Sequence, residues 1–74
     1  MSNNIIDFEL DPENEYIELI KLLKLLNLCE SGSEAKIVVT EGLVKFNGEV
    51  ELQKRKKLRR QDCIEFEGTI VNII

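Results

Sequence analysis

Six cations occupy seven consecutive positions in this chain, in the run Lys54-Arg55-Lys56-Lys57-Leu58-Arg59-Arg60. We call residues 54–60 the basic segment. The chain of 74 residues has a formal net charge of -4, so this positive charge is a local feature. Lysine and arginine bind phosphate groups and release the counterions condensed around a polyanion. The basic segment therefore predicts contact with a polyanion, for which the local field matters more than the overall charge.

Acidic and basic side chains are separated along the chain. Residues 1–30 carry a net charge of -5, from seven acidic side chains and two lysines, whereas residues 45–60 carry +5. An acidic total is therefore compatible with a nucleic-acid partner. An alternative stays open: a small protein–protein adaptor could use the acidic amino-terminal surface or an open sheet edge. A nuclear localisation signal is disfavoured, because the run lies between predicted strands.

The sequence indicates no catalytic or metal site. It contains no histidine, and its two cysteines are Cys29 and Cys63. A zinc site lacks ligands and no disulfide framework is suggested, so we expect two free thiols that are buried or half-buried. Without the commonest general base, we expect a protein that is not an enzyme and that needs no metal and no cofactor.

The length of the chain predicts one domain, residues 1–74, with a core of about residues 5–74. No apolar run is long enough to cross a bilayer, and Met1-Ser2-Asn3-Asn4 does not resemble the start of a signal peptide. We therefore expect a cytoplasmic protein without membrane contact. We also expect the protein to be a monomer.

Residues 6–10 alternate apolar and acidic side chains, which predicts a strand with one buried face. Asp11-Pro12 predicts the end of that strand and the start of a helix, because Asp caps free amides and Pro suits the first helical position. Residues 16–26 give this helix a wide apolar face. Ser31-Gly32-Ser33-Glu34 matches a capping box, and Gly42 suits the position after a helix. Two helices joined by a short link thus form a helix-turn-helix-like unit, in which the second helix turns Ala35, Val38 and Val39 inward.

Asn47-Gly48 lies between two strand-like runs and predicts a hairpin. A two-residue loop would place Phe46 opposite Glu49 and mix apolar and acidic side chains on one face. A three-residue loop with a bulge pairs Phe46 with Val50, so we prefer the longer loop. Lys45 then faces solvent.

The basic segment follows neither the strand nor the helix period, so we expect an exposed crossing segment fixed by its apolar member, Leu58. Residues 62–66 alternate again, Glu67-Gly68 predicts a turn, and residues 69–74 form a last strand.

The order of these elements resembles the RNA-binding domain named after ribosomal protein S-four, also called the alpha-L motif. The matching residues lie on the second helix, the hairpin and the strand after the basic segment. They are Ser31-Gly32-Ser33-Glu34-Ala35-Lys36, Glu41-Gly42-Leu43-Val44-Lys45-Phe46-Asn47-Gly48, Lys54-Arg55, Lys57-Leu58 and Asp62-Cys63-Ile64-Glu65-Phe66-Glu67-Gly68. Over about residues 5–74, the chain looks most like the stand-alone bacterial members.

The resemblance implies an α+β fold in which two packed helices lie against a small, mainly antiparallel sheet of four to five short strands. It also implies binding of structured RNA, ribosomal or transfer RNA, along the second helix and the hairpin, with possible association with the ribosome. Six residues fall on matching family positions: Ser31, Lys36, Lys45, Lys54, Arg55 and Lys57. The chemistry of phosphate binding adds Lys56, Arg59 and Arg60.

Two departures from the family pattern are visible. Many members have arginine where this chain has Gly32, which removes a phosphate contact. Many have Gly-Asp where this chain has Gln61-Asp62, so the family pattern does not predict the conformation of this turn. Free amides at Ser31 to Ser33 could receive a phosphate, although plain helix capping explains the same residues.

The aromatic residues offer few platforms on which bases could stack. The three phenylalanines, Phe8, Phe46 and Phe66, occupy inward strand positions, and the position of Tyr16 is ambiguous. We therefore expect recognition by phosphate geometry and RNA shape, with little reading of unstacked bases.

Overall fold

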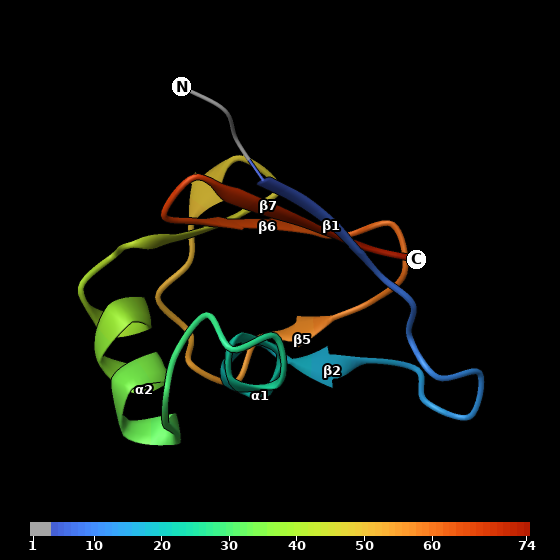
Figure 1. The fold of residues 1–74 in the computed structure, drawn as a ribbon, viewed down its shortest axis with the longest axis horizontal. Helices are drawn as coiled ribbons and strands as arrows, with labels where there is room; N and C mark the ends of the chain where they lie inside the picture. The colour runs from blue at the N-terminus through green and yellow to red at the C-terminus, as the bar shows by residue number, and fades with distance from the viewer. Residues whose placement is uncertain (1–3) are drawn as a thin grey trace.

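A five-stranded sheet lies above two helices and a small two-stranded sheet in the computed structural model, which describes residues 4–74 (Figure 1). Met1, Ser2 and Asn3, at the start of the predicted domain, lie outside the described residues. The elements in chain order are β1 (Asn4–Phe8), β2 (Ile17–Glu18), α1 (Leu19–Leu25), α2 (Gly32–Thr40), β3 (Val44–Phe46), β4 (Glu49–Val50), β5 (Lys57–Leu58), β6 (Cys63–Phe66) and β7 (Thr69–Ile73).

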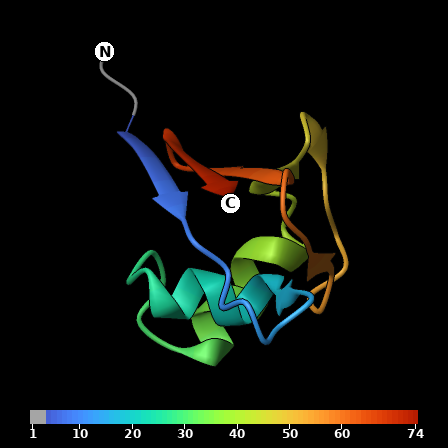
Figure 2. The same ribbon diagram turned by 90° about the vertical axis from the view of Figure 1, so that its right-hand side faces the viewer.

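The larger sheet has the strand order β1-β7-β6-β3-β4. Only the pair β1 and β7 is parallel, and the other three pairs are antiparallel. The first and last strands thus lie side by side, as the blue and red arrows show in Figure 2. The predicted α+β fold, with two packed helices against a mainly antiparallel sheet, is confirmed.

Apolar side chains fill the space between the larger sheet and the helices. Helix α1 contributes Leu19, Leu22 and Leu23, all fully buried. Helix α2 contributes Ala35, Val38 and Val39, as its capping and spacing predicted. The sheet and the basic segment add Val44, Leu58, Ile64, Phe66, Val71 and Ile73 to this core, and Leu10, Ile17 and Cys29 complete it.

The first helix begins later than predicted. The Asp11 side chain accepts a hydrogen bond from the Glu13 amide at 2.9 Å, and the Asn14 amide donates to the Asp11 carbonyl at 2.9 Å. These bonds close a turn, so the prediction that Asp11-Pro12 starts a helix is wrong. Helix α1 begins only at Leu19, because Ile17–Glu18 are held in strand β2.

The backbone of the basic segment caps helix α1. Glu18, at the N-cap position, makes no side-chain capping bond. Instead, the amides of Leu19 and Ile20 donate to the carbonyls of Lys56 and Lys54, at 2.9 and 3.2 Å. These amides have no partner within the helix, so the segment satisfies donors that would otherwise be unpaired.

Part of the basic segment is a strand, which the sequence did not predict. Lys57–Leu58 form β5 and pair with Ile17–Glu18 of β2. Two residues are too few to establish a strand period, which explains the missed element. Leu58 is fully buried and fixes the segment as predicted.

The hairpin has a two-residue loop, so the predicted longer loop is wrong. Phe46 pairs with Glu49 and Lys45 with Val50. Asn47 and Gly48 have φ of 50° and 90°, the positive values that a tight hairpin turn requires. Strand β4 is exposed on both faces, so this register buries no carboxylate.

The turn at Gln61-Asp62 forms although it lacks the glycine common in the family. Gln61 takes a φ of 78°, and its amide donates to the Ile73 carbonyl at 2.7 Å. The Asp62 carboxylate accepts from the Arg59 amide at 2.7 Å and from the Asn47 side-chain amide at 3.4 Å. Asp62 therefore joins the end of the basic segment to the hairpin turn.

Exchanging glycine at the two turns should change stability in opposite directions. Gln61→Gly should raise the free energy of unfolding by about 0.5–1 kcal/mol, because it removes left-handed strain from a side chain. Gly48→Ala should lower it by about 1 kcal/mol: the added methyl group meets no atom within 4 Å but the backbone becomes strained. Urea unfolding of the wild-type protein and the two variants measures both changes. A lower free energy of unfolding in Gln61→Gly would contradict the assignment of strain to Gln61.

The two cysteines should differ in reactivity. Burial raises the pKa of the Cys29 thiol, and the carboxylates of Glu34 and Glu67 raise it further, so less thiolate forms at a given pH. Cys63 is only half-buried. Alkylation of the folded protein with iodoacetamide at pH 8, mapped by mass spectrometry, should modify Cys63 first. Faster modification of Cys29 would contradict this assignment.

Candidate nucleic-acid interface

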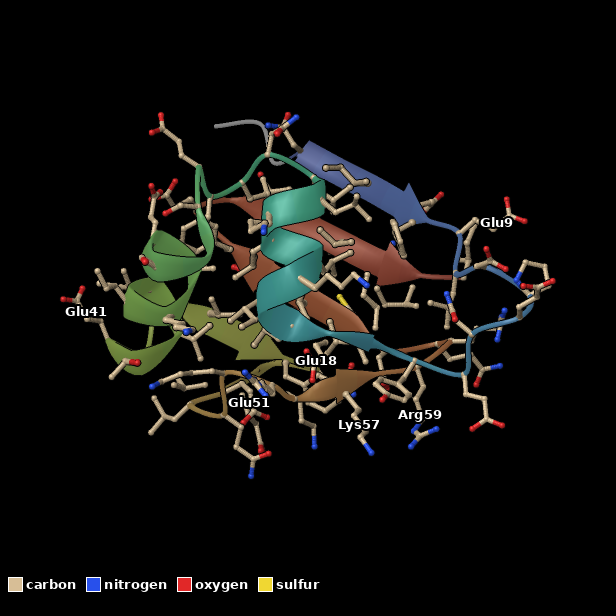
Figure 3. The ribbon with its side chains drawn as sticks, turned by 90° about the horizontal axis from the view of Figure 1, so that it is seen from below. Glu9, Glu18, Glu41, Glu51, Lys57 and Arg59 are labelled. Atoms are coloured by element: carbon tan, nitrogen blue, oxygen red, sulfur yellow. The ribbon has the colours of Figure 1, made fainter. Side chains whose placement is uncertain are left out.

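Four cations of the basic segment project into solvent from a fixed backbone. Leu58 points into the core, so Lys57 and Arg59, its two neighbours, point to the opposite side (Figure 3). Lys54 and Arg55 are exposed where the segment passes the start of α1. The backbone bonds therefore order the segment while these four side chains stay accessible.

Helix α2 adds a cation to this group. Lys36 and Lys54 line one shallow pocket of about 340 Å³, together with Ile37, Thr40 and Glu41. The fold thus brings together two cations that are separated in the sequence. Glu41 reduces the local positive potential but leaves two lysines against one carboxylate. We call Lys36, Lys54, Arg55, Lys57 and Arg59 the cationic surface.

Lys45 lies apart from the cationic surface. Its neighbours Val44 and Phe46 pack toward the core, so the Lys45 side chain points away from the helices. It lies in register with Glu65 on one neighbouring strand and Val50 on the other.

Ser31 also lies apart, at the amino-terminal end of α2. Its hydroxyl accepts from the Glu34 amide at 3.2 Å, which confirms the predicted cap. The Glu34 carboxylate reaches the Glu30 amide at 3.5 Å rather than the amide of Ser31. Two glutamates next to this helix start oppose the approach of a phosphate.

Arg60 binds the protein's own backbone. Its guanidinium donates to the carbonyls of Leu10 at 3.0 Å, Asp11 at 3.1 Å and Asn14 at 3.4 Å. The side chain thus ties the end of the basic segment to the loop between β1 and β2. Arg60 is exposed, as Lys57 and Arg59 are, but its guanidinium is held by these hydrogen bonds to the backbone.

Two aromatic rings lie against cations of the basic segment. The Lys56 ammonium is 4.9 Å from the centre of the Phe46 ring. Lys57 and Arg59 approach the Tyr16 ring, with distances of 4.9 Å from Nζ and 5.9 Å from Cζ to its centre. Phe46 is half-buried and Tyr16 is 39% exposed.

Sequence reasoning left Tyr16 undecided, and local pattern could not have placed it. The alternation Lys57-Leu58-Arg59 shows that the two cations share a face. Which ring they meet follows only from the pairing of β2 with β5, between Ile17 and Leu58.

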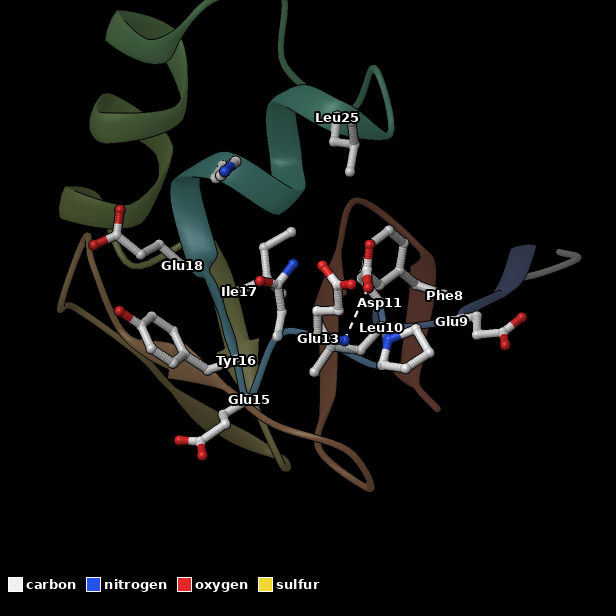
Figure 4. Close-up of a pocket in the computed structure, with 13 residues that line it drawn as sticks. Phe8, Glu9, Leu10, Asp11, Glu13, Glu15, Tyr16, Ile17, Glu18 and Leu25 are labelled. Carbon is white, nitrogen blue, oxygen red and sulfur yellow. Dashed lines mark hydrogen bonds between the residues drawn. The ribbon is translucent and has the colours of Figure 1, made fainter.

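A separate acidic groove of about 920 Å³ lies along the loop between β1 and β2 (Figure 4). Phe8, Leu10 and Ile17 supply apolar lining. One lysine, Lys21, and five carboxylates also line the groove, those of Glu9, Asp11, Glu13, Glu15 and Glu18. The Tyr16 ring is directed away from Phe8 and Leu10, on the outer side of the groove. The protein therefore presents two surfaces of opposite charge.

Within residues 4–74, no helix is long and apolar enough to cross a membrane. In the same range, no three Cys, Asp or Glu side chains are arranged to hold a metal ion.

Comparison with known proteins adds three findings. The model of a family described as "S4 domain" matches residues 9–74. The YbcJ proteins of Escherichia coli (strain K12) and Shigella flexneri are each 40% identical to this chain over 62 residues, which cover 84% of this chain and 89% of the relative. The solution structure of YbcJ from E. coli superimposes with a TM-score of 0.72 and 38% identity, covering 100% of this chain and 92% of that one. The family match over most of the chain and these similarities show that this protein belongs to the S4 domain family.

Proposed function

We propose that this protein binds structured RNA through the cationic surface and catalyses no reaction. Ribosomal and transfer RNA are the candidate partners, and binding by the protein as a monomer is part of the proposal. The observation that carries it is the anchored basic segment, whose backbone caps α1 and pairs with β2 while four of its cations face solvent. The solution structure of YbcJ is described as revealing a motif involved in RNA binding, which supports the same function here.

Phosphate contacts from such a surface position an RNA without reading its sequence. Long cationic side chains lose conformational entropy when they bind, but a fixed backbone limits that loss to the side chains. Lys36 and Lys54 meet at one pocket, and Lys57 and Arg59 share one side of the segment. The surface therefore suits a phosphate backbone that follows the basic segment from α2 toward Tyr16.

Lys45, Ser31 and Lys56 were also predicted to bind RNA, but they lie outside the cationic surface and contribute less in this proposal. An RNA that reaches Lys45 must pass round the hairpin to the opposite sheet face, and one that reaches Ser31 must approach Glu30 and Glu34. Lys56 lies over Phe46 and can turn outward. Because this chain has Gly32 where many family members have arginine, it has less positive charge near Ser31. The basic segment therefore contributes a larger share of the binding free energy.

The acidic groove favours a second candidate, a protein–protein adaptor. Its apolar lining and five carboxylates suit a peptide that carries lysine or arginine beside apolar residues. Such binding would use the β1–β2 loop and leave the cationic surface free.

Reversing two charges on the cationic surface should weaken RNA binding strongly. Lys54→Glu with Arg55→Glu removes two phosphate contacts, so the slope of log affinity against log salt should become shallower by about 1.5. Lys21→Glu with Lys24→Glu is the matched control, because it changes the net charge equally on the exposed side of α1. Fluorescence anisotropy with a labelled RNA hairpin, titrated at several salt concentrations, measures both variants. Equal losses in the two variants would show a general charge effect and contradict the proposed surface.

Replacing Arg60 should affect stability more than RNA binding. Arg60→Ala removes three hydrogen bonds to backbone carbonyls and should lower the free energy of unfolding by about 1–2 kcal/mol. The salt slope measured with the same RNA hairpin should stay within error of the wild-type value. A large change in slope with unchanged stability would place Arg60 in the RNA contact instead.

A further inference from the structure

We propose that Tyr16 forms a stacking site for one unpaired RNA nucleotide, with Arg59 as the ligand of the adjoining phosphate. The inference rests on the proposed RNA binding and adds a preference for RNA with an unpaired base over a continuous duplex. Expectations from sequence alone favoured phosphate geometry with little base stacking, because three of the four aromatic residues occupy inward positions.

The position of Tyr16 is set by the residue that follows it. Ile17 is 8% exposed and pairs with the fully buried Leu58, so β2 is fixed at this point. Alternation along an extended chain then turns Tyr16 outward, beside the outward residues of β5. Tyr16 is the last residue of the β1–β2 loop; it keeps 39% of its surface exposed and is held next to the paired residue Ile17.

The surroundings of the ring match what a nucleotide requires. A base stacks on an aromatic face whatever its identity, while cations nearby hold the phosphates. Lys57 and Arg59 lie 4.9 and 5.9 Å from the ring centre and come from the cationic surface itself. One exposed ring and two cations therefore offer both kinds of contact within the length of a nucleotide.

The cation contacts on the ring do not prevent stacking. A cation over an exposed aromatic ring contributes roughly a 2- to 5-fold change in an equilibrium constant. Stacking of a base on an aromatic side chain contributes about 5- to 150-fold. A base can therefore displace a cation from the ring, and the released cation is then free to bind a phosphate.

The two cations beside Tyr16 are not equivalent. Glu18 lies in register with Lys57 across the β2–β5 pair and offsets part of its charge. The Arg59 amide is held by the Asp62 carboxylate, which fixes the start of the Arg59 side chain. The planar guanidinium also offers several donors to one phosphate, so Arg59 is the better phosphate ligand.

A stacking site of this kind discriminates between RNA shapes. Bases inside a continuous duplex are already stacked and would have to be pulled out to reach Tyr16. A bulged or looped nucleotide needs little or no unstacking, so only such RNA gains the additional contact.

The test compares a short RNA duplex with the same duplex carrying one bulged 2-aminopurine nucleotide. Wild-type protein should bind the bulged RNA roughly 10-fold more tightly and quench the 2-aminopurine fluorescence as the base stacks. Tyr16→Leu should lose that preference, with unchanged affinity and salt slope for the continuous duplex. Tyr16→Phe keeps the ring and should retain both the preference and the quenching.

The possible results separate the two proposals. If wild-type protein and Tyr16→Leu bind the bulged RNA equally well, the stacking site is wrong while RNA binding stands. If Tyr16→Leu weakens binding of both RNAs equally, Tyr16 supports the basic segment and stacks no base. If wild-type protein binds neither RNA, the proposed function fails and the stacking site fails with it. Circular dichroism of each variant confirms that it is folded.

Discussion

The fold depends on the contact between the start of α1 and the backbone of the basic segment. Helix α1 has no side-chain cap, and the amides of Leu19 and Ile20 find acceptors only in the carbonyls of Lys56 and Lys54. That contact also places β5 against β2 and sends Leu58 into the core. The six cations of the basic segment repel one another. Their backbone is nevertheless held in one conformation, because two of its carbonyls accept hydrogen bonds from the start of α1.

In the basic segment, the backbone and the side chains have different roles. Carbonyls and amides of the basic segment complete the fold, while most of its charged side chains point outward. Some of them also contact the protein itself: the Arg60 guanidinium ties the β1–β2 loop in place, and the Lys56 ammonium lies over the Phe46 ring. Asp62 joins the other end to the hairpin turn through Arg59 and Asn47. A cationic surface built in this way keeps its shape before any RNA arrives, which lowers the entropic cost of binding.

Much of this structure followed from local sequence patterns. The cap at Ser31, the inward residues of α2 and the burial of Leu58 were all predicted, because each depends on neighbours within a few positions. The start of α1, strand β5 and the hairpin register were not. The first two depend on pairing between Ile17 and Leu58, which no local pattern encodes, and the register follows from positive φ at Asn47 and Gly48 on an exposed strand. The same long-range pairing places Tyr16 beside Lys57 and Arg59, so the ring could not be assigned from sequence.

The central claim is that RNA contacts the cationic surface, and residue-by-residue mapping in solution tests it most directly. The measurement is a titration of isotope-labelled protein with an RNA hairpin, followed by two-dimensional NMR of the backbone amides. We predict that the largest shifts fall on residues 54–59, on Lys36 and on Tyr16, and that they shrink as salt is added. Shifts confined to residues 9–15 around the acidic groove, or unaffected by salt, would contradict the account.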